Sequence, residues 1–142
     1  MNASDLASRL RLDIARMARR LRQEAGAGLS PSQTAALATI ERHGPLTPSE
    51  LANRERVQRP TVTRVLARLE EAGLVERAAD PADRRSWLVS VSAGGRELLD
   101  AVRTRKDAYL ATRLEALEPE DREVLDRAAA LLERMLQDGS ER

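Results

Sequence analysis

Apolar residues recur every three or four positions over most of this chain, which predicts a mainly helical protein. Between residues 74 and 91 the pattern changes to an alternation of apolar and polar residues, which predicts two short strands. Helix-capping residues, glycine and proline separate the segments. The expected elements are helices at about 5–25, 31–43, 48–53 and 59–72, strands at 74–77 and 87–91, and helices at about 93–116 and 119–138.

The starts of these helices carry recognisable capping residues. Ser30 with Gln33, and Thr47 with Glu50, have the spacing of a capping box, in which each side chain bonds the other residue's backbone N–H. A proline follows each of these two caps, at the first helical position, where its missing N–H costs nothing. We expect Ser4 or Asp5 to cap the first helix, and Ser92 to cap the fifth.

The stretch from Leu46 to Ser92 places a short helix, a turn, a longer helix and a hairpin in succession. The longer helix begins near Arg59 and ends at Gly73, a residue that accepts the left-handed conformation of a helix terminus. One face of this helix is apolar, with Val62, Val65, Leu66 and Leu69. This order of elements is typical of a winged helix-turn-helix, in which the second helix enters the major groove of DNA.

The opposite face of the longer helix is polar and basic. It carries Gln58, Arg59, Thr61, Thr63, Arg64 and Arg68. Arginine forms paired hydrogen bonds with guanine, glutamine pairs with adenine, and threonine contacts phosphate or the thymine methyl group. We expect the first five residues to contact base edges or phosphates, and Arg68 to contact phosphate. The alternative interpretation is an arginine-rich face that only meets solvent.

Two arginines lie at the tip of the predicted hairpin, within the polar turn at residues 78–85. Arginine suits a narrow, electronegative minor groove, so we expect Arg85 to probe it. Asp83 stands two residues earlier and is expected to orient the Arg85 guanidinium, while Arg84 contacts phosphate. The alternative is an ordinary charged hairpin with a local ion pair.

Together these motifs resemble the MarR family of bacterial transcriptional regulators. The resemblance rests on Leu51-Ala52, Thr61-Val62-Thr63-Arg64, the LEEAGLV stretch at 69–75, the DPADRR turn at 80–85, the VSVS strand at 89–92 and Gly95. It covers essentially the whole chain, and it implies a dimeric DNA-binding repressor that is often relieved by a small molecule. The chain departs from the family at Gln58, where a serine cap is common, and at Glu118, where serine or threonine is common before Pro119.

The two ends of the chain carry wide apolar stripes. The residues concerned are Leu6, Leu10, Ile14, Met17 and Leu21 in the first helix, and Val124, Leu125, Ala128, Leu131, Leu132, Met135 and Leu136 in the last. A small winged helix cannot bury both stripes, whereas a twofold homodimer can. We therefore expect residues 1–30 and 93–142 to form dimerisation helices around a DNA-binding region at 31–92. A self-contained helical bundle is the alternative.

Composition narrows the function further. The formal net charge is only +1, so the basic character is local: five arginines and one acid lie between Arg54 and Arg68. The chain has no cysteine, which excludes a thiol redox switch, a cysteine-ligated zinc site and disulfides. It has one histidine, His43, which we expect at a helix C-terminus, where the dipole favours its cation, and it lacks a glycine-rich phosphate loop and a nucleophilic serine elbow. We therefore expect no enzyme, no metal and no cofactor.

The remaining expectations concern partners. In the family that the chain resembles, a cleft between the dimerisation helices and the winged domain binds small aromatic or anionic effectors, which implies a site here near Met17, Leu21, Leu37 and Ile40. The chain has no apolar run of membrane-spanning length and no secretory leader, so we expect a cytoplasmic protein without a membrane partner. Double-stranded DNA is the expected macromolecular partner. A winged helix that binds only an acidic protein is the competing hypothesis.

Overall fold

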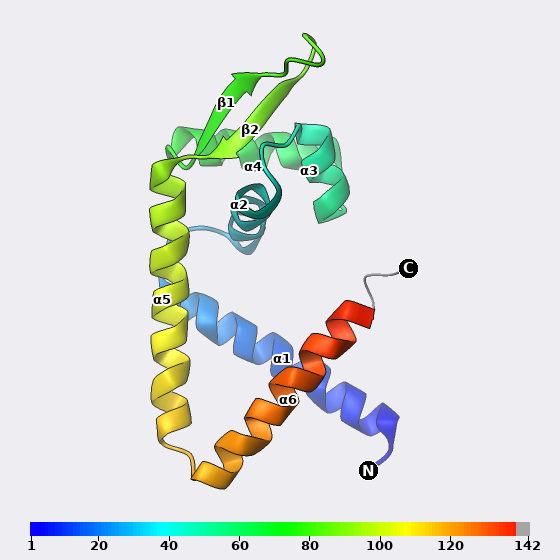
Figure 1. Cartoon of the computed structure of the whole chain (residues 1–142), viewed down its shortest axis with the longest axis vertical. Helices are drawn as coiled ribbons and strands as arrows, with labels where there is room; N and C mark the ends of the chain where they lie inside the picture. The colour runs from blue at the N-terminus through cyan, green and yellow to red at the C-terminus, as the bar shows by residue number, and fades with distance from the viewer. Residues whose placement is uncertain (139–142) are drawn as a thin grey trace. The chain divides into compact units, whose positions relative to one another are not determined.

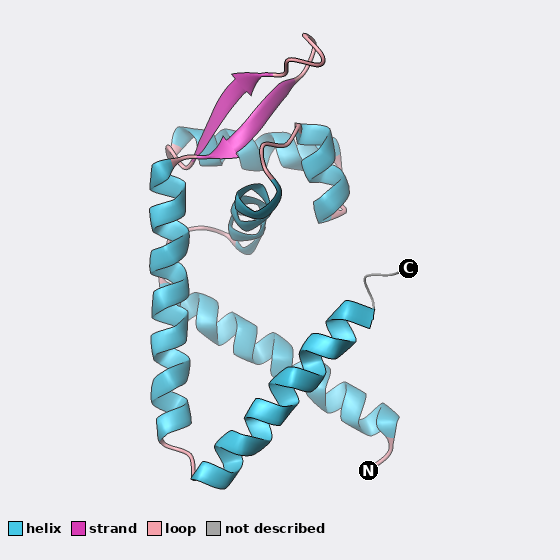
Figure 2. Ribbon diagram, in the orientation of Figure 1, coloured by secondary structure: helices cyan, strands magenta, loops and turns pink. Residues whose placement is uncertain are grey.

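The computed structural model describes residues 1–138, which form six α-helices and one two-stranded antiparallel sheet (Figures 1 and 2). The elements are α1 (Ala3–Ala25), α2 (Pro31–His43), α3 (Pro48–Glu55), α4 (Arg59–Glu71), β1 (Val75–Ala79), β2 (Trp87–Val91), α5 (Ala93–Glu115) and α6 (Pro119–Asp138). The mainly helical winged helix-turn-helix expected from the sequence is confirmed. The chain divides into two compact units, Met1–Lys106 and the residues from Asp107 onward.

The core of the first unit is built from the apolar faces of α2, α3, α4 and the hairpin. Its most deeply buried side chains are Leu37, Ile40, Leu51, Leu66, Leu69 and Val89. Each leucine buried in this way stabilises the fold by roughly 1.5–3 kcal/mol relative to an exposed one. The apolar face predicted for the α4 helix is the face that packs into this core, with Val62, Leu66 and Leu69 buried and Val65 partly buried.

The two-stranded sheet covers the core, and one residue before α3 pairs with β2 as well. β1 pairs with β2 in antiparallel register, with Val75 opposite Val91 and Ala79 opposite Trp87. Leu46, just before α3, forms an isolated bridge to Val89 through two backbone hydrogen bonds of 3.0 and 2.8 Å. This bridge fixes the start of α3 to the hairpin. The strand β1 runs two residues past its predicted end at Arg77, because pairing with β2 continues through Ala79.

The predicted helix signals are mostly correct, with three differences. The box at α2 is complete: the Gln33 N–H donates to Ser30 Oγ at 3.2 Å, and the Ser30 N–H donates to Gln33 Oε1 at 3.0 Å. At α3 only the Glu50 N–H donates to Thr47 Oγ1, at 3.1 Å, and within residues 1–138 the Glu50 side chain does not return the bond. The cap of α1 is Asn2, not Ser4 or Asp5, because Asn2 Oδ1 accepts the Asp5 N–H at 2.8 Å. The helix α3 continues past Asn53 to Glu55.

The end of α4 and the start of α5 meet at Ser92. Gly73 has φ +74° and closes α4 in a Schellman motif, with the Leu74 N–H donating to the Leu69 carbonyl at 2.9 Å. Ser92 is 7 % exposed; its hydroxyl donates to the Gly73 carbonyl at 2.6 Å and accepts the Gly95 N–H at 3.0 Å. A Cβ on Gly95 would overlap the Leu74 carbonyl oxygen. The hairpin therefore approaches α5 as closely as a glycine permits.

In α1 and α6 most of the large apolar side chains are exposed. In α1 only Ala25 is buried, and Met17 is 47 % exposed. In α6, within the second unit, no residue is buried, and Leu131 and Leu136 are 54 % and 77 % exposed. His43 ends α2 as expected from its place before Gly44.

Candidate nucleic-acid interface

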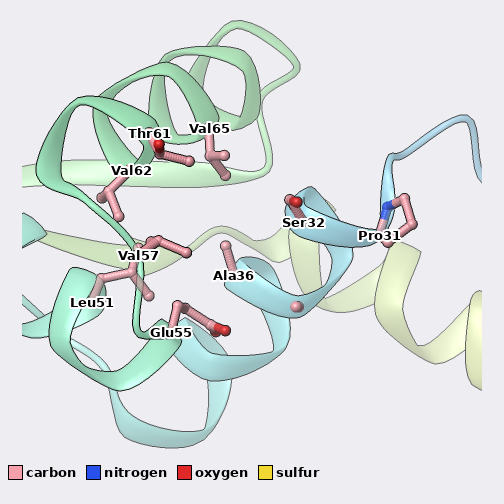
Figure 3. A pocket seen from close by; sticks show the side chains of 10 residues that line it. Pro31, Ser32, Ala36, Leu51, Glu55, Val57, Thr61, Val62 and Val65 are labelled. Atoms are coloured by element: carbon pink, nitrogen blue, oxygen red, sulfur yellow. The ribbon is translucent and has the colours of Figure 1, made fainter.

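The helix α4 turns one face to the core and the other to solvent. Val62, Leu66 and Leu69 are buried, and the candidate readers Gln58, Arg59, Thr63, Arg64 and Arg68 are all exposed. Thr61 differs from the other candidates. It is half-buried and lines a cavity against α2, so it does not share the exposed face (Figure 3).

The hydrogen bonds within the protein determine which donors and acceptors of each candidate side chain remain available to DNA. The Arg59 guanidinium donates to Ser49 Oγ on α3 at 2.7 Å, which orients Arg59 and leaves its other N–H groups available. The Thr63 hydroxyl donates to the Arg59 carbonyl at 3.1 Å, so Thr63 presents a methyl group and an acceptor lone pair. Gln58 occupies the N-cap position of α4 but forms no capping hydrogen bond. The amide side chain of Gln58 is therefore free of a capping role. This agrees with the presence of glutamine at a position where the family commonly has a serine cap.

Arg64 and Arg68 carry positive charge without local compensation. Both are exposed, and neither forms an ion pair within the described part of the chain. They lie four residues apart, so they project from the same side of the helix. A polyanion is the partner that this side of α4 suits best.

The hairpin tip is shaped by two aspartates. Asp80 Oδ1 accepts the Ala82 N–H at 2.9 Å, and Asp83 Oδ1 accepts the Arg85 N–H at 2.9 Å. The expectation that Asp83 holds the Arg85 guanidinium is wrong for this structure, because a short side chain reaches the backbone amide two residues on more easily. Asp83 instead fixes the turn. Arg84 and Arg85 are exposed at the tip.

The hairpin has a brace to α4 that the sequence did not reveal. The Arg77 guanidinium lies over the Trp87 ring, 3.7 Å from its centroid, and pairs with Glu70 of α4 at 3.0 Å. Arg77 and Trp87 are diagonal neighbours on one face of the sheet, which only the strand register establishes. The ion pair ties the hairpin to α4, which lies next to it in Figure 1.

The four residues expected around an effector differ in how exposed they are. Leu37 and Ile40 are fully buried in the core, Leu21 is half-buried and Met17 is exposed. None of the four lines the apolar cavity of about 290 Å³ that lies between α2, α3 and α4 (Figure 3). That cavity depends on how three helices pack, so no motif in the sequence marked it.

Residues 1–138 contain neither a metal-binding cluster nor a membrane-spanning helix. No group of three or more His, Cys, Asp or Glu side chains there is arranged to hold a metal ion. In the same residues, no helix has both the length and the apolar content needed to cross a membrane.

Comparison with known proteins places this geometry in a family. The sequence matches the profile of the MarR family over residues 29–87. It is 44% identical to an HTH-type transcriptional regulator of Mycobacterium tuberculosis over 128 residues, 89% of this chain and 90% of that protein. It is 33% identical to the HTH-type transcriptional repressor MdtR of Bacillus subtilis over 94 residues, 66% of this chain and 61% of that protein.

A solved structure agrees with these sequence matches. The crystal structure of a putative transcriptional regulator from Pseudomonas aeruginosa superposes with a TM-score of 0.83 at 37% identity, covering 94% of this chain and 95% of that one. The fold, the exposed basic helix and the hairpin thus occur together in a chain with regulator homologues along nearly its whole length. The chain belongs to the MarR family and is a winged helix-turn-helix transcriptional regulator that binds DNA, not an enzyme.

Proposed function

We propose that this regulator is a homodimeric repressor that binds a pseudo-palindromic operator through α4 and the β1–β2 hairpin. The observation that carries the proposal is the set of exposed arginines without ion pairs in the described residues, Arg64 and Arg68 on α4 and Arg84 and Arg85 at the hairpin tip. Repression is supported by the relative MdtR, which is named a transcriptional repressor.

We assign a contact with DNA to each of these side chains from its position and exposure. Gln58, Arg59, Thr63 and Arg64 read base edges or adjacent phosphates in the major groove, because all four lie exposed in the first turns of α4. Arg68 and Arg84 contact phosphates, and Arg85 enters the minor groove. Asp83 acts by shaping the turn that presents Arg85. Thr61, which faces the cavity, couples that cavity to α4.

Dimerisation explains the exposed stripes of the terminal helices. α1 and α6 carry exposed leucine, isoleucine, valine and methionine side chains that a second copy would cover. In this arrangement residues 1–30 and 93–138 form the dimerisation region, and residues 31–92 form the DNA-binding region; the last four residues of the expected region 93–142 lie outside the described residues. Two copies of α4 would then address half-sites about one helical turn apart, ~34 Å.

Release by a small molecule is the proposed mode of regulation. The cavity between α2, α3 and α4 is lined by Thr61, Val62 and Val65 of α4, the recognition helix proposed to enter the major groove. A ligand shifts the protein towards the state that binds it better, so it weakens DNA binding only if the cavity differs between the DNA-bound and free states. Because three residues of α4 line the cavity, a shift of α4 on DNA binding would change the shape of the cavity and thus its affinity for the ligand.

The test is fluorescence anisotropy of the purified protein with duplexes from its own upstream region and with scrambled duplexes, at two salt concentrations. We expect specific binding at least ~10³-fold tighter than binding to scrambled DNA, weakening steeply with salt. Arg64→Ala is expected to cost about 1–3 kcal/mol of specific binding. Arg16→Ala, which removes the same charge from the exposed surface of α1, is the matched control.

The outcomes separate the proposal from its competitor. Equal, weak binding to specific and scrambled duplexes, with genomic fragments giving no preferred site either, would overturn operator recognition and leave an acidic protein as the partner of the arginines. Light scattering on the same sample gives the oligomeric state, and a monomer at micromolar concentration would overturn the homodimer.

A further inference from the structure

The cavity between α2, α3 and α4 is mostly apolar, with the hydroxyl side chains of Ser32 and Thr61 and one charged side chain in its lining. Ala36, Leu51, Val62 and Val65 supply apolar lining, and the cavity has a volume of about 290 Å³ (Figure 3). Among the residues that line it in the described part of the chain, only Glu55 carries a charge. This cavity therefore offers one carboxylate inside a mostly hydrocarbon surface.

The Glu55 side chain is held in place. Glu55 is partly buried, and one carboxylate oxygen accepts a hydrogen bond from the Thr39 hydroxyl of α2. No arginine or lysine forms an ion pair with Glu55 within residues 1–138. Glu55 is also the last residue of α3, where the partial negative charge of the helix terminus adds to that of the carboxylate.

The positive end of a helix also borders this cavity, but it has little to offer an anion. Pro31, the first residue of α2, has no N–H, and Ser30 already caps the N–H of Gln33, so the N–H and hydroxyl of Ser32 are the neutral donors that remain there. An anionic guest would lie beside Glu55 without a cation to offset the repulsion. A cationic guest would gain a charge partner and keep its apolar part out of water.

We propose that the cavity binds a lipophilic monocation, an aromatic or alkyl ammonium compound of modest size, with Glu55 as its counter-ion. The proposed consequence, release of DNA through contact with Thr61 and Val65 of α4, rests on the function proposed above. This ligand class differs from the aromatic or anionic effector that the family resemblance implied. It follows from Glu55, a residue that no sequence motif singled out.

The direct test compares three probes of similar shape by isothermal titration calorimetry on the full-length protein. They are benzyltrimethylammonium, its uncharged isostere neopentylbenzene, and the anion phenylacetate. We expect the cation to bind at least tenfold more tightly than the neutral isostere, about 1.4 kcal/mol, and the anion not to bind. Equal binding of cation and neutral isostere, tighter binding of the anion, or no binding of the cation at millimolar concentration would overturn the proposal.

Two variants assign the effect to this cavity. Glu55→Gln keeps the shape and the acceptor for Thr39 but removes the charge, so we expect it to abolish the preference for the cation. Glu50→Gln makes the same change on the exposed surface of α3, away from the cavity, and is expected to leave the preference intact. Ala35→Leu fills the cavity from an exposed position on α2 and should remove binding of all probes, which keeps the test decisive if Glu55→Gln folds poorly.

DNA binding is measured on the same samples without any probe. Specific DNA binding together with no binding of the cation would refute the ligand class and leave the proposed function standing. Cation binding that depends on Glu55, without specific DNA binding, would refute the proposed function and leave the site standing. Cation binding that leaves operator affinity unchanged would overturn the coupling to α4.

Discussion

Adding one methyl group to each of two adjacent glycines should change stability in opposite directions. A Cβ on Gly95 would lie 2.7 Å from Val91 Cγ2 and closer still to the Leu74 carbonyl oxygen, which is backbone and cannot swing away. A Cβ on Gly94 would have only ordinary contacts, the nearest at 3.4 Å from the Gly73 carbonyl oxygen. The two positions share a helix turn, so their backbone propensities are similar.

The magnitudes follow from two competing effects. Alanine is favoured over glycine in a helix by about 1 kcal/mol, less in the first turn, so Gly94→Ala is expected to stabilise the protein by a few tenths to about 1 kcal/mol. At Gly95 the same gain is outweighed by overpacking, which costs about 1–3 kcal/mol and more when backbone must move. We therefore expect Gly95→Ala to lower the free energy of unfolding by about 1–2 kcal/mol.

Urea denaturation followed by the fluorescence of Trp87, the one tryptophan of the chain, measures this difference. Protein concentration must be the same for all variants, because the stability of a dimer depends on it. The two variants should differ in midpoint and share the slope of the wild type. If Gly95→Ala is as stable as Gly94→Ala, the close approach of the hairpin to α5 is not present in solution and the argument fails.

Four further predictions concern the DNA interface, the stability of the hairpin and the proposed dimer interface. Arg85→Ala should weaken operator binding and lower the salt slope by about one charge, and unchanged affinity and slope in anisotropy titrations would show that the hairpin tip does not touch DNA. Asp83→Ala should weaken binding through loss of the turn, whereas Asp83→Asn, which keeps the acceptor for the Arg85 amide, should bind nearly as well as wild type. Arg77→Ala should destabilise the hairpin by about 0.5–2 kcal/mol, read from chemical denaturation, since it removes the cation–π contact with Trp87; an unchanged midpoint would contradict that brace. Leu131→Glu should disrupt the proposed dimer and give a monomer in light scattering, and a persistent dimer would place the interface elsewhere.

The sequence predicted correctly those features that depend on residues close together in one helix. The buried face of α4 follows from residues three and four apart, and Gly73 marks its end because few other residues adopt a positive φ readily. The complete capping box at Ser30 was equally local. At α1 the local signal was ambiguous, because Asn2, Ser4 and Asp5 are all residues that cap helices.

The sequence was uninformative where contacts join separate elements. Thr61 belongs to the polar residues of α4 by spacing, yet the packing of α2 turns it towards a cavity. The contact of Arg77 with Trp87 needs the strand register, and the exposure of Glu55 to an apolar cavity needs the packing of three helices. Asp83 shows a further limit, since its distance from Arg85 along the chain allows both an ion pair and a backbone bond, and only the structure distinguishes them.

The Ser92 hydroxyl joins the end of α4, the end of β2 and the start of α5, and it has consequences for the geometry of the operator. Separating any of the three elements would leave a nearly buried polar group without a partner, at a cost of about 1–3 kcal/mol. When α5 rotates, the recognition helix, the hairpin and the first turn of α5 should therefore move together as one unit. In a dimer, a small rotation of α5 would change the separation of the two recognition helices and leave the contacts made within each half-site intact. Mutations in α5 would then alter the preferred number of base pairs between half-sites before they alter which bases are read.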